Sequence, residues 1–345
     1  MPIILPANQP AARFYKGGPQ IDRFRGAQPS GSTTKAGPAY EPEDWVASTT
    51  PCYGCRPLGL TTLPDGRLLA DAVAADPEHW LGPAHVAAFG ADTKLLVKLL
   101  DAGQRLPVHA HPDGRWARKH VPGATHGKAE AWYILTGGEV WLGLKEDVSI
   151  DELEQMVASQ DVDDLLGKLH RFNVQPHQTV YVPPGFMHAI GEGVLVVEVQ
   201  EPSDLSVLLE WKGFAIDGVN KGHLSVGWDT ALTAVDRVGR SRKDIEKLLV
   251  LPGDHVVSST SESVLASSSN PYFRLEHVAV AEGQQQSIEQ GFSVIVVLDG
   301  EVTLSSAVAE SVQANKCNTI LVAFADGSLT LSGVGKMLIA RPPSP

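Results

Sequence analysis

Residues 104–135, QRLPVHAHPDGRWARKHVPGATHGKAEAWYIL, carry the strongest structural signal in the chain. They include His109 and His111, separated by one residue, and Glu130 at the start of an apolar run. Residues i and i+2 of an extended strand point to the same face, so the two imidazoles should converge on one point. Two imidazoles and a carboxylate directed into a barrel would supply three metal ligands.

A second stretch, YVPPGFMHAIGEG at residues 181–193, supplies a fourth candidate ligand, His188. Pro183 and Gly185 precede it in a Pro-x-Gly-x-x-His pattern, which predicts a tight corner between two strands. A single buried histidine is more often a hydrogen-bonded core residue than a ligand. Four candidate ligands in two motifs, each beside an apolar strand-like run, favour a metal site instead.

The composition is that of an ordinary globular protein. The chain has 345 residues, of which 43% are hydrophobic and 20% charged, enough for two packed domains. Its formal net charge of −12 argues against nucleic acid or an anionic membrane surface as the main partner. No apolar run is long enough to span a bilayer, and MPIILPANQPAARF lacks the pattern of a signal peptide. A cytoplasmic location is therefore expected.

The cysteines are too few for a disulfide framework. Cys52 and Cys55 form a CxxC pair, and Cys317 is the only other cysteine in the sequence. A structural zinc would need a second ligand pair. The neighbouring prolines, Pro51 and Pro57, disfavour the strand-to-helix junction typical of a redox dithiol. A structural role is the preferred interpretation, with redox use second.

The first 215 residues predict one barrel and its N-terminal extension. Residues 1–40 are rich in Gly, Pro, Ser and Thr, and they predict a loop with a strand, FYKGGPQIDRFRG, packed on the barrel. Residues 41–215 form the expected metal-binding domain. Within it, the Pro-Glu pair in EPEDWVAST at 41–49 predicts a helix start, and TKLLVKLLDA at 93–102 predicts a buried strand.

The pattern changes twice farther along the chain. Residues 149–169 place apolar side chains at helical spacing behind a Ser149–Glu152 capping box, which predicts a helical insert between the two motifs. Short apolar strands resume later, and residues 216–345 predict a second barrel-like domain. Its counterpart of the histidine corner, VAFADGSLTL at 322–331, contains no histidine, so we expect this barrel to lack a metal.

Taken together, these stretches resemble class I mannose-6-phosphate isomerases of the cupin superfamily. The resemblance covers most of the chain beyond the N-terminal loop. It implies a mainly β fold, in which a cupin jelly-roll barrel with a helical insert is joined to a second, degenerate cupin-like barrel. It also implies a metal-dependent aldose–ketose isomerase acting on a sugar or sugar phosphate. The stretches that carry it are VKLLDAGQRLPVHAHPD, GKAEAWYIL, VYVPPGFMHAI and VLVVEVQEPSDLS.

The resemblance also assigns site residues. The family's metal ligands, a Gln, a His, a Glu and a His, correspond to His109, His111, Glu130 and His188, so the Gln is replaced here. The family's lysine two residues before the Glu corresponds to Lys128. Its acidic residue ahead of a Ser-Asp pair corresponds to Glu198, and the pair itself to Ser203–Asp204. Lys128 and Glu198 are thus the catalytic candidates, and Asp204 is a substrate-binding candidate.

The chemistry of isomerisation explains why these residue types matter. An aldose–ketose interconversion moves a proton between neighbouring carbons, and a divalent metal stabilises the enediolate that forms as negative charge develops. A side chain must carry the proton. Lys128 and Glu198 are the candidates, and His120 or His126 could serve if their loop folds inward. From the residues alone, Lys128 could equally be a solvated loop lysine.

The ligand set leaves the metal and the reaction class open. Three histidines and a glutamate suit one divalent ion, which could be Zn, Mn, Fe, Co or Ni. Zinc is what the resemblance implies. The same donors also fit an iron cupin oxygenase or a non-catalytic sugar-binding cupin, and these stay as alternatives to the isomerase.

Two observations about the substrate conflict. The family's arginine four residues after the aspartate is replaced by Leu208, which favours a free or unfamiliar sugar. In contrast, residues 112–129 are basic and contain a single acid. Guanidinium groups bind phosphate through two parallel hydrogen bonds, so Arg118, and after it Arg115, are candidate phosphate ligands. A solvated basic surface is the alternative. The sequence does not indicate an oligomeric state.

Overall fold

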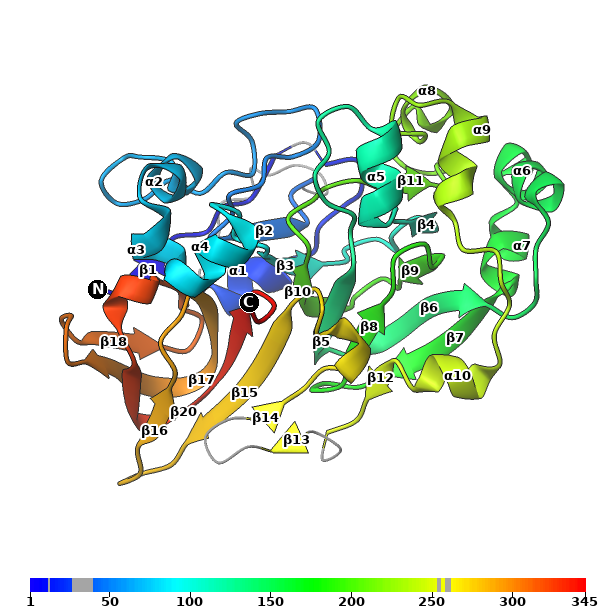
Figure 1. Ribbon diagram of the computed structural model, residues 1–345. Helices are drawn as coiled ribbons and strands as arrows, with labels where there is room; N and C mark the ends of the chain where they lie inside the picture. The colour runs from blue at the N-terminus through cyan, green and yellow to red at the C-terminus, as the bar shows by residue number, and fades with distance from the viewer. Residues whose placement is uncertain (12, 27–39, 253–255, 258–261) are drawn as a thin grey trace, which may run out of the picture.

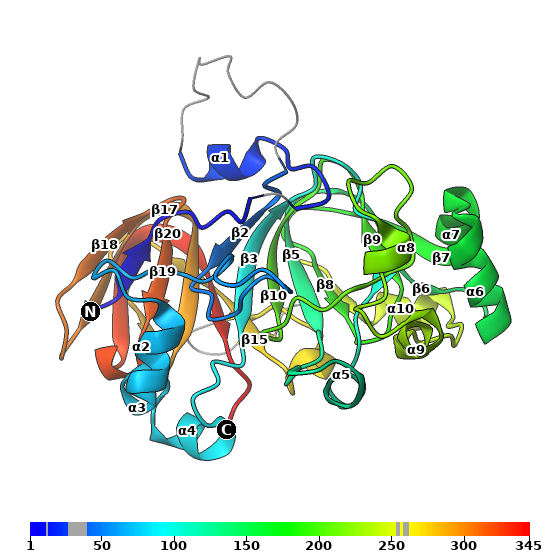
Figure 2. The ribbon, with the colours of Figure 1, turned by 90° about the horizontal axis from the view of Figure 1, so that it is seen from above.

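The computed structural model describes residues 1–11, 13–26, 40–252, 256–257 and 262–345, and antiparallel β-sheet is its main component (Figure 1). Two β-rich units lie side by side, and helices α6 and α7 lie at the end far from the second unit (Figure 2). The predicted mainly β fold of two barrel-like units is confirmed. Within the described residues, no helix is long and apolar enough to cross a membrane.

Two sheets build the first unit. A six-stranded sheet has the order β12-β8-β5-β10-β3-β2, and a five-stranded sheet has the order β11-β4-β9-β6-β7. The strands of the first sheet are Leu249–Val250, Thr179–Val182, Glu130–Thr136, Leu195–Gln200, Leu96–Asp101 and Glu43–Val46. Those of the second are Val207–Leu208, His109–Ala110, His188–Ile190, Gly138–Leu144 and Leu169–Val174.

The six-stranded sheet is buried on both faces, and strand β5 shows how. Trp132 and Ile134 pack into the core inside the first unit. Ala131 and Tyr133, on the opposite face, pack into a core shared with the second unit. Strands β3 and β10 alternate in the same way, because successive side chains of a strand point to opposite faces. The strands of a sheet that is covered on both faces have continuous apolar sequences, and residues 93–102 are an example.

A single nine-stranded sheet forms the second unit. Its main order is β1-β19-β17-β20-β15-β14-β13, with β16 paired to β20 and β18 paired to β17. The strands are β1 Ile3–Leu5, β13 Val256–Val257, β14 Glu262–Ser263, β15 Arg274–Val280, β16 Gln286–Ile288, β17 Ser293–Ser306, β18 Val312–Asn315, β19 Thr319–Val322 and β20 Leu329–Arg341. The long strands β17 and β20 contribute to two cores, one within this unit and one against the first unit.

Short helices flank the sheets. They are α1 Gln20–Phe24, α2 Leu69–Ala75, α3 Pro77–Leu81, α4 Pro83–Phe89, α5 Gly114–His120, α6 Ile150–Ser159, α7 Val162–Gly167, α8 Gly218–Lys221, α9 Trp228–Ala231 and α10 Arg242–Glu246. Three 3₁₀ turns are Leu232–Ala234, Ser267–Ser269 and Phe324–Asp326. Helices α6 and α7 form the predicted insert, and the Ser149 side chain accepts a hydrogen bond from the Glu152 amide.

Two local predictions were wrong. The segment FYKGGPQIDRFRG contains helix α1 rather than a strand, with Ile21 buried and Phe24 packed against the same core. These two apolar residues are three apart, which is a helical spacing. The segment EPEDWVAST contains strand β2 rather than a helix start, and all four residues of that strand are buried beside β3.

The domain boundaries at 40 and 215 stay predictions. Two strand pairings connect the predicted parts. Strand β1, from the N-terminal part, pairs with β19 of the second unit. Strand β12, which lies beyond residue 215, pairs with β8 of the first unit.

A core substitution in the second unit should destabilise the chain. Ile295 on β17 is fully buried in that unit's own core, so Ile295→Ala should lower the free energy of unfolding by about 2–5 kcal/mol. Val308 is 70% exposed, and Val308→Ala should change it by less than about 0.5 kcal/mol. Urea unfolding of both variants measures the difference. Equal effects would contradict the described core.

Candidate metal centre and active site

Three histidines meet in the interior of the first unit. His109 on β4 lies directly opposite His188 on β9, and His111 follows two residues after His109 on the same face. Ligand nitrogen atoms of all three lie within 4.8 Å of one another, and all three side chains are buried. The convergence expected from the i, i+2 spacing is therefore present, and it includes the histidine of the second motif.

A backbone carbonyl fixes the ring orientation of each histidine. Each Nδ1 lies 2.8 Å from an acceptor: His109 on Pro107 O, His111 on Leu205 O and His188 on Phe186 O. A carbonyl can only accept, so each Nδ1 donates to it and each Nε2 faces the interior of the group. His188 Nε2 is buried without a hydrogen-bond partner. This is the arrangement in which proteins hold metal-ligating imidazoles.

Burial keeps two of the histidines neutral. Desolvation, assisted by the neighbouring His188, puts the pKa of His109 well below its usual value. Desolvation and the Lys128 ammonium lower the pKa of His111 to about 3. The neutral imidazole is the form that binds a metal, so both rings are prepared for that role at neutral pH.

Glu130 stands beside two of the three histidines. Its Oε2 lies 3.1 Å from His111 Nε2, and its Oε1 lies 3.2 Å from His188 Nε2. Trp132 Nε1 donates to Oε1 at 3.1 Å, which orients the carboxylate. Burial raises the pKa of Glu130, but Lys128 and His111 outweigh burial and hold it well below its usual value. Three buried imidazoles with a carboxylate beside two of them are a donor set that fits a divalent metal ion.

Lys128 is a buried residue at the edge of this group. Its Nζ lies 3.0 Å from Glu130 Oε2 and 3.0 Å from His111 Nε2. It also lies 3.7 Å from Glu198 Oε1. Lys128 is only 6% exposed, which rules out the solvated loop lysine that the sequence left open.

Glu198 comes from the middle of the same sheet. It lies on β10, opposite Lys98 of β3 and Trp132 of β5. Its Oε1 is 3.5 Å from Lys98 Nζ. Burial raises the pKa of this carboxyl, and the opposing effect of Lys98 is smaller. Glu198 thus retains a proton to higher pH than an exposed glutamate does.

A second set of buried charges extends the site toward the N-terminus; sequence reasoning named Asp204 as a substrate-binding candidate but missed Arg13, Glu43 and Lys98. Arg13 forms two hydrogen bonds to Asp204, at 3.1 and 3.2 Å. Glu43 on β2 accepts hydrogen bonds from Tyr15 and from Trp45 Nε1, and it lies 3.7 Å from Lys98 Nζ. Burial raises the pKa of Glu43, but Arg13 and Lys98 outweigh burial and bring it to about 2.

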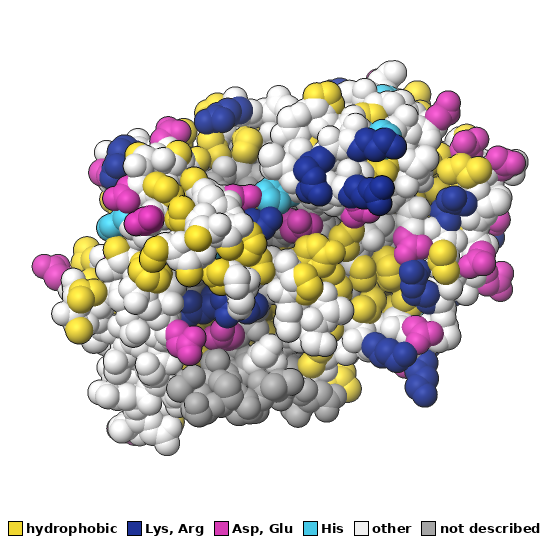
Figure 3. All heavy atoms as spheres, in the orientation of Figure 1, with side chains coloured by type: hydrophobic (Ala, Val, Ile, Leu, Met, Phe, Trp, Pro, Cys, Tyr) yellow, Lys and Arg dark blue, Asp and Glu magenta, His cyan; other side chains and the backbone are white. Residues whose placement is uncertain are grey.

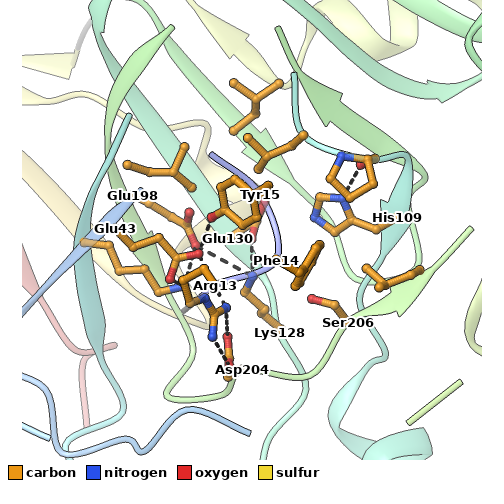
Figure 4. A pocket seen from close by; sticks show the side chains of 16 residues that line it. Arg13, Phe14, Tyr15, Glu43, His109, Lys128, Glu130, Glu198, Asp204 and Ser206 are labelled. Atoms are coloured by element: carbon orange, nitrogen blue, oxygen red, sulfur yellow. Dashed lines mark hydrogen bonds and ion pairs between the residues drawn. The ribbon is translucent and has the colours of Figure 1, made fainter. Parts of the chain in front are cut away.

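These groups enclose one small pocket (Figure 4). The charged and polar lining residues are Arg13, Tyr15, Glu43, Lys98, His109, Lys128, Glu130, Glu198, Asp204 and Ser206. The apolar lining residues are Phe14, Leu100, Leu106, Pro107, Ile190 and Leu208.

The basic loop lies elsewhere. Arg115 and Arg118 are exposed on helix α5, and neither is among the residues that line the pocket. Arg118 Nη1 donates to Thr125 O at 3.1 Å. Lys and Arg side chains gather on the surface over α5 (Figure 3). His120 contacts the Trp116 ring, and His126 is paired with Asp92 at 2.6 Å; neither lines the pocket.

The CxxC pair is also separate from this pocket. Cys52 is buried against Trp45 and Leu96, whereas Cys55 is exposed, and both thiols are free. Burial raises the pKa of Cys52 to about 12. An inert, packed thiol at Cys52 agrees with the structural interpretation of this residue.

Comparisons with known proteins place this geometry in context. No family model matches the chain. A mannose-6-phosphate isomerase of Streptococcus mutans is 42% identical over 113 residues, which are 32% of this chain and 34% of that protein. Mannose-6-phosphate isomerase ManA of Bacillus subtilis is 39% identical over 118 residues, 33% of this chain and 36% of that protein. The chain thus matches about a third of the length of these curated relatives.

Solved structures extend the likeness along the whole chain. The mannose 6-phosphate isomerase of Bacillus subtilis superposes with a TM-score of 0.68 at 20% identity, covering 99% of both chains. A variant of phosphomannose isomerase from Salmonella typhimurium superposes with a TM-score of 0.73 at 15% identity, also covering 99% of both chains. The predicted family resemblance is confirmed: the chain is similar in sequence, over a third of its length, to mannose-6-phosphate isomerases, and it shares the fold of the two solved isomerases.

Proposed function

We propose that this chain is a metal-dependent aldose–ketose isomerase of the mannose-6-phosphate isomerase type, acting on a sugar or sugar phosphate. The observation that supports it best is the placement of Lys128 and Glu198. Both can carry a proton, both are buried, and both line the same pocket as Glu130 and His109. The curated relatives named above are isomerases of this type.

The proposed cofactor is one divalent metal ion held by His109, His111, Glu130 and His188. Three imidazoles and a carboxylate suit zinc, and also Mn, Fe, Co or Ni. Zinc is our proposal because the resemblance implies it. When bound, the ion supplies a Lewis acid that stabilises negative charge on the sugar oxygens.

Lys128 and Glu198 have complementary parts in the proposed proton transfer. The Lys128 ammonium offers three donors, and its contact with Glu130 positions it beside the ligand set. The raised pKa of Glu198 suits a group that must take up and return a proton. The 3.7 Å separation of Lys128 Nζ from Glu198 Oε1 is an ion-pair distance, so the charge of each group stabilises the opposite charge on the other.

The pocket also limits side reactions. Most of its lining side chains are buried, and Phe14 and Tyr15 form part of its wall. Exclusion of bulk water strengthens the electrostatic contacts inside and protects a reactive carbanion-like intermediate. The expected partner is a small sugar. A cytoplasmic location, and the absence of nucleic-acid and membrane partners, stay predictions from the sequence.

The metal assignment predicts a stoichiometry. Protein purified without added metal should contain about one equivalent of a divalent transition metal by elemental analysis. His188→Ala should lose the metal and the activity, because a methyl group cannot coordinate. His79→Ala, which removes an exposed histidine, is the matched control and should retain both. Full metal content in His188→Ala would refute the assignment.

The reaction class predicts an isotope pattern. Turnover in heavy water should place deuterium on the sugar carbon next to the carbonyl, as measured by NMR. Lys128→Met should slow this incorporation by roughly 10²–10⁴-fold and leave the metal content unchanged. Lys119→Met, on the exposed face of α5, should behave like the wild type. Oxygen uptake without deuterium incorporation would indicate the oxygenase instead, and binding without turnover would indicate a sugar-binding cupin.

A further inference from the structure

We infer that the pocket accepts an uncharged sugar rather than a sugar phosphate. This inference rests on the proposed isomerase function and narrows its substrate class. A phosphoryl group carries nearly two negative charges at neutral pH and is held in proteins by cations that are free to pair with it. The charges on the pocket walls therefore decide whether such a group can be accommodated.

Each cation on the pocket wall already has its own buried carboxylate. Arg13 is paired with Asp204 at 3.1 Å, Lys128 with Glu198 at 3.7 Å, and Lys98 with Glu43 at 3.7 Å. These three pairings use each of the three carboxylates once. Glu130, the fourth carboxylate on the wall, is the proposed metal ligand and also lies 3.0 Å from Lys128 Nζ. Among the described residues that line the pocket, three cations thus face four carboxylates, and no cation is left over for a phosphate.

Breaking one of these pairs to bind a phosphate would be unfavourable. The carboxylate left behind would stay buried next to a second anion, and unpaired buried charges are strongly destabilising. A sugar hydroxyl has no such requirement. It can donate to a carboxylate and accept from an ammonium while the ion pairs stay in place.

The opposite wall is apolar, which also suits an uncharged ring. Leu208 lies on β11 directly opposite His109, and its side chain lines the pocket together with Phe14 and Ile190. A hydrocarbon surface beside the ligand set can pack against the C–H groups of a sugar but offers no donor to a phosphate. Leu208 is therefore the position at which this wall selects the substrate.

Arg105, Arg115 and Arg118 do not supply the missing cation. Arg105 pairs through two contacts with the fully buried Glu210, which also accepts a hydrogen bond from the Val108 amide. Arg115 and Arg118 are exposed on α5, outside the pocket lining. The phosphate role expected of these two residues from the sequence competes with the present inference, and experiment separates the two.

The test uses metal-loaded full-length protein and matched pairs of probes. Aldoses and ketoses of five and six carbons are each compared with their terminal phosphates, by turnover and by titration calorimetry. We expect at least one free sugar to bind and to turn over with a kcat/KM at least tenfold above that of its phosphate. Inorganic phosphate at 10-fold excess over the sugar should not inhibit.

A substitution at the apolar wall provides the converse test. Leu208→Arg adds an unpaired guanidinium beside the ligand set and should shift the ratio of kcat/KM toward the sugar phosphate by at least tenfold. Leu208→Met conserves volume without charge and should keep the wild-type ratio. If Leu208→Arg does not fold, the comparison of free sugars with their phosphates in the wild type still tests the inference.

The outcomes separate this inference from the proposed function. Tighter binding or faster turnover of the sugar phosphates by the wild type would overturn the inference while leaving the isomerase function intact. A selective loss of sugar phosphate turnover in Arg118→Ala would overturn it in favour of a phosphate site on α5. Calorimetric binding of free sugars without isomerisation would support it and refute the proposed function. Binding of neither class would overturn both.

Discussion

The pairing of β4 with β9 is the constraint on which the site depends. It sets His109 opposite His188, and side chains directly opposite on antiparallel strands lie about 4.5–5.5 Å apart. A one-residue slip would move His109 and His111 together to the other face, where Val108 and Ala110 now pack in a separate core. The register is therefore fixed by apolar burial on one face, and the ligand geometry on the other face follows from it.

The buried charges define the pocket rather than stabilise the fold. Removing charged groups from water is costly, and paired contacts offset that cost without a clear surplus. Their arrangement instead ties distant parts of the chain to one place, since Arg13 meets Asp204 and Tyr15 meets Glu43. Because these pairs satisfy one another before any substrate arrives, the charges that line the pocket balance one another apart from the candidate metal ligand Glu130.

The sequence predicted the histidine group because period-two spacing is a local property of a strand. It missed Arg13, Glu43 and Lys98, since only the folded chain brings those parts together. The sequence did contain a signal for Lys98. It is a charged residue within a continuous apolar run, and such a run predicts a strand that is covered on both faces of its sheet. Glu43 was missed because its Pro-Glu pair predicted a helix start, whereas the segment forms strand β2 and pairs with β3. In this segment, pairing with a strand distant in the sequence outweighs the local helix signal.

The second unit has a role in the site although its described strands lie outside the pocket. Glu130 shares the inward face of β5 with Trp132, while Ala131 and Tyr133 on the other face pack in the core that contains Val294 and Val296 of β17. The strand that presents the carboxylate is thus packed from both sides. A ligand must be held to within about half an ångström to be effective, and a half-exposed strand would hold it less firmly. The second unit therefore supports the candidate site by packing against the sheet that carries Glu130, Glu198 and Lys98.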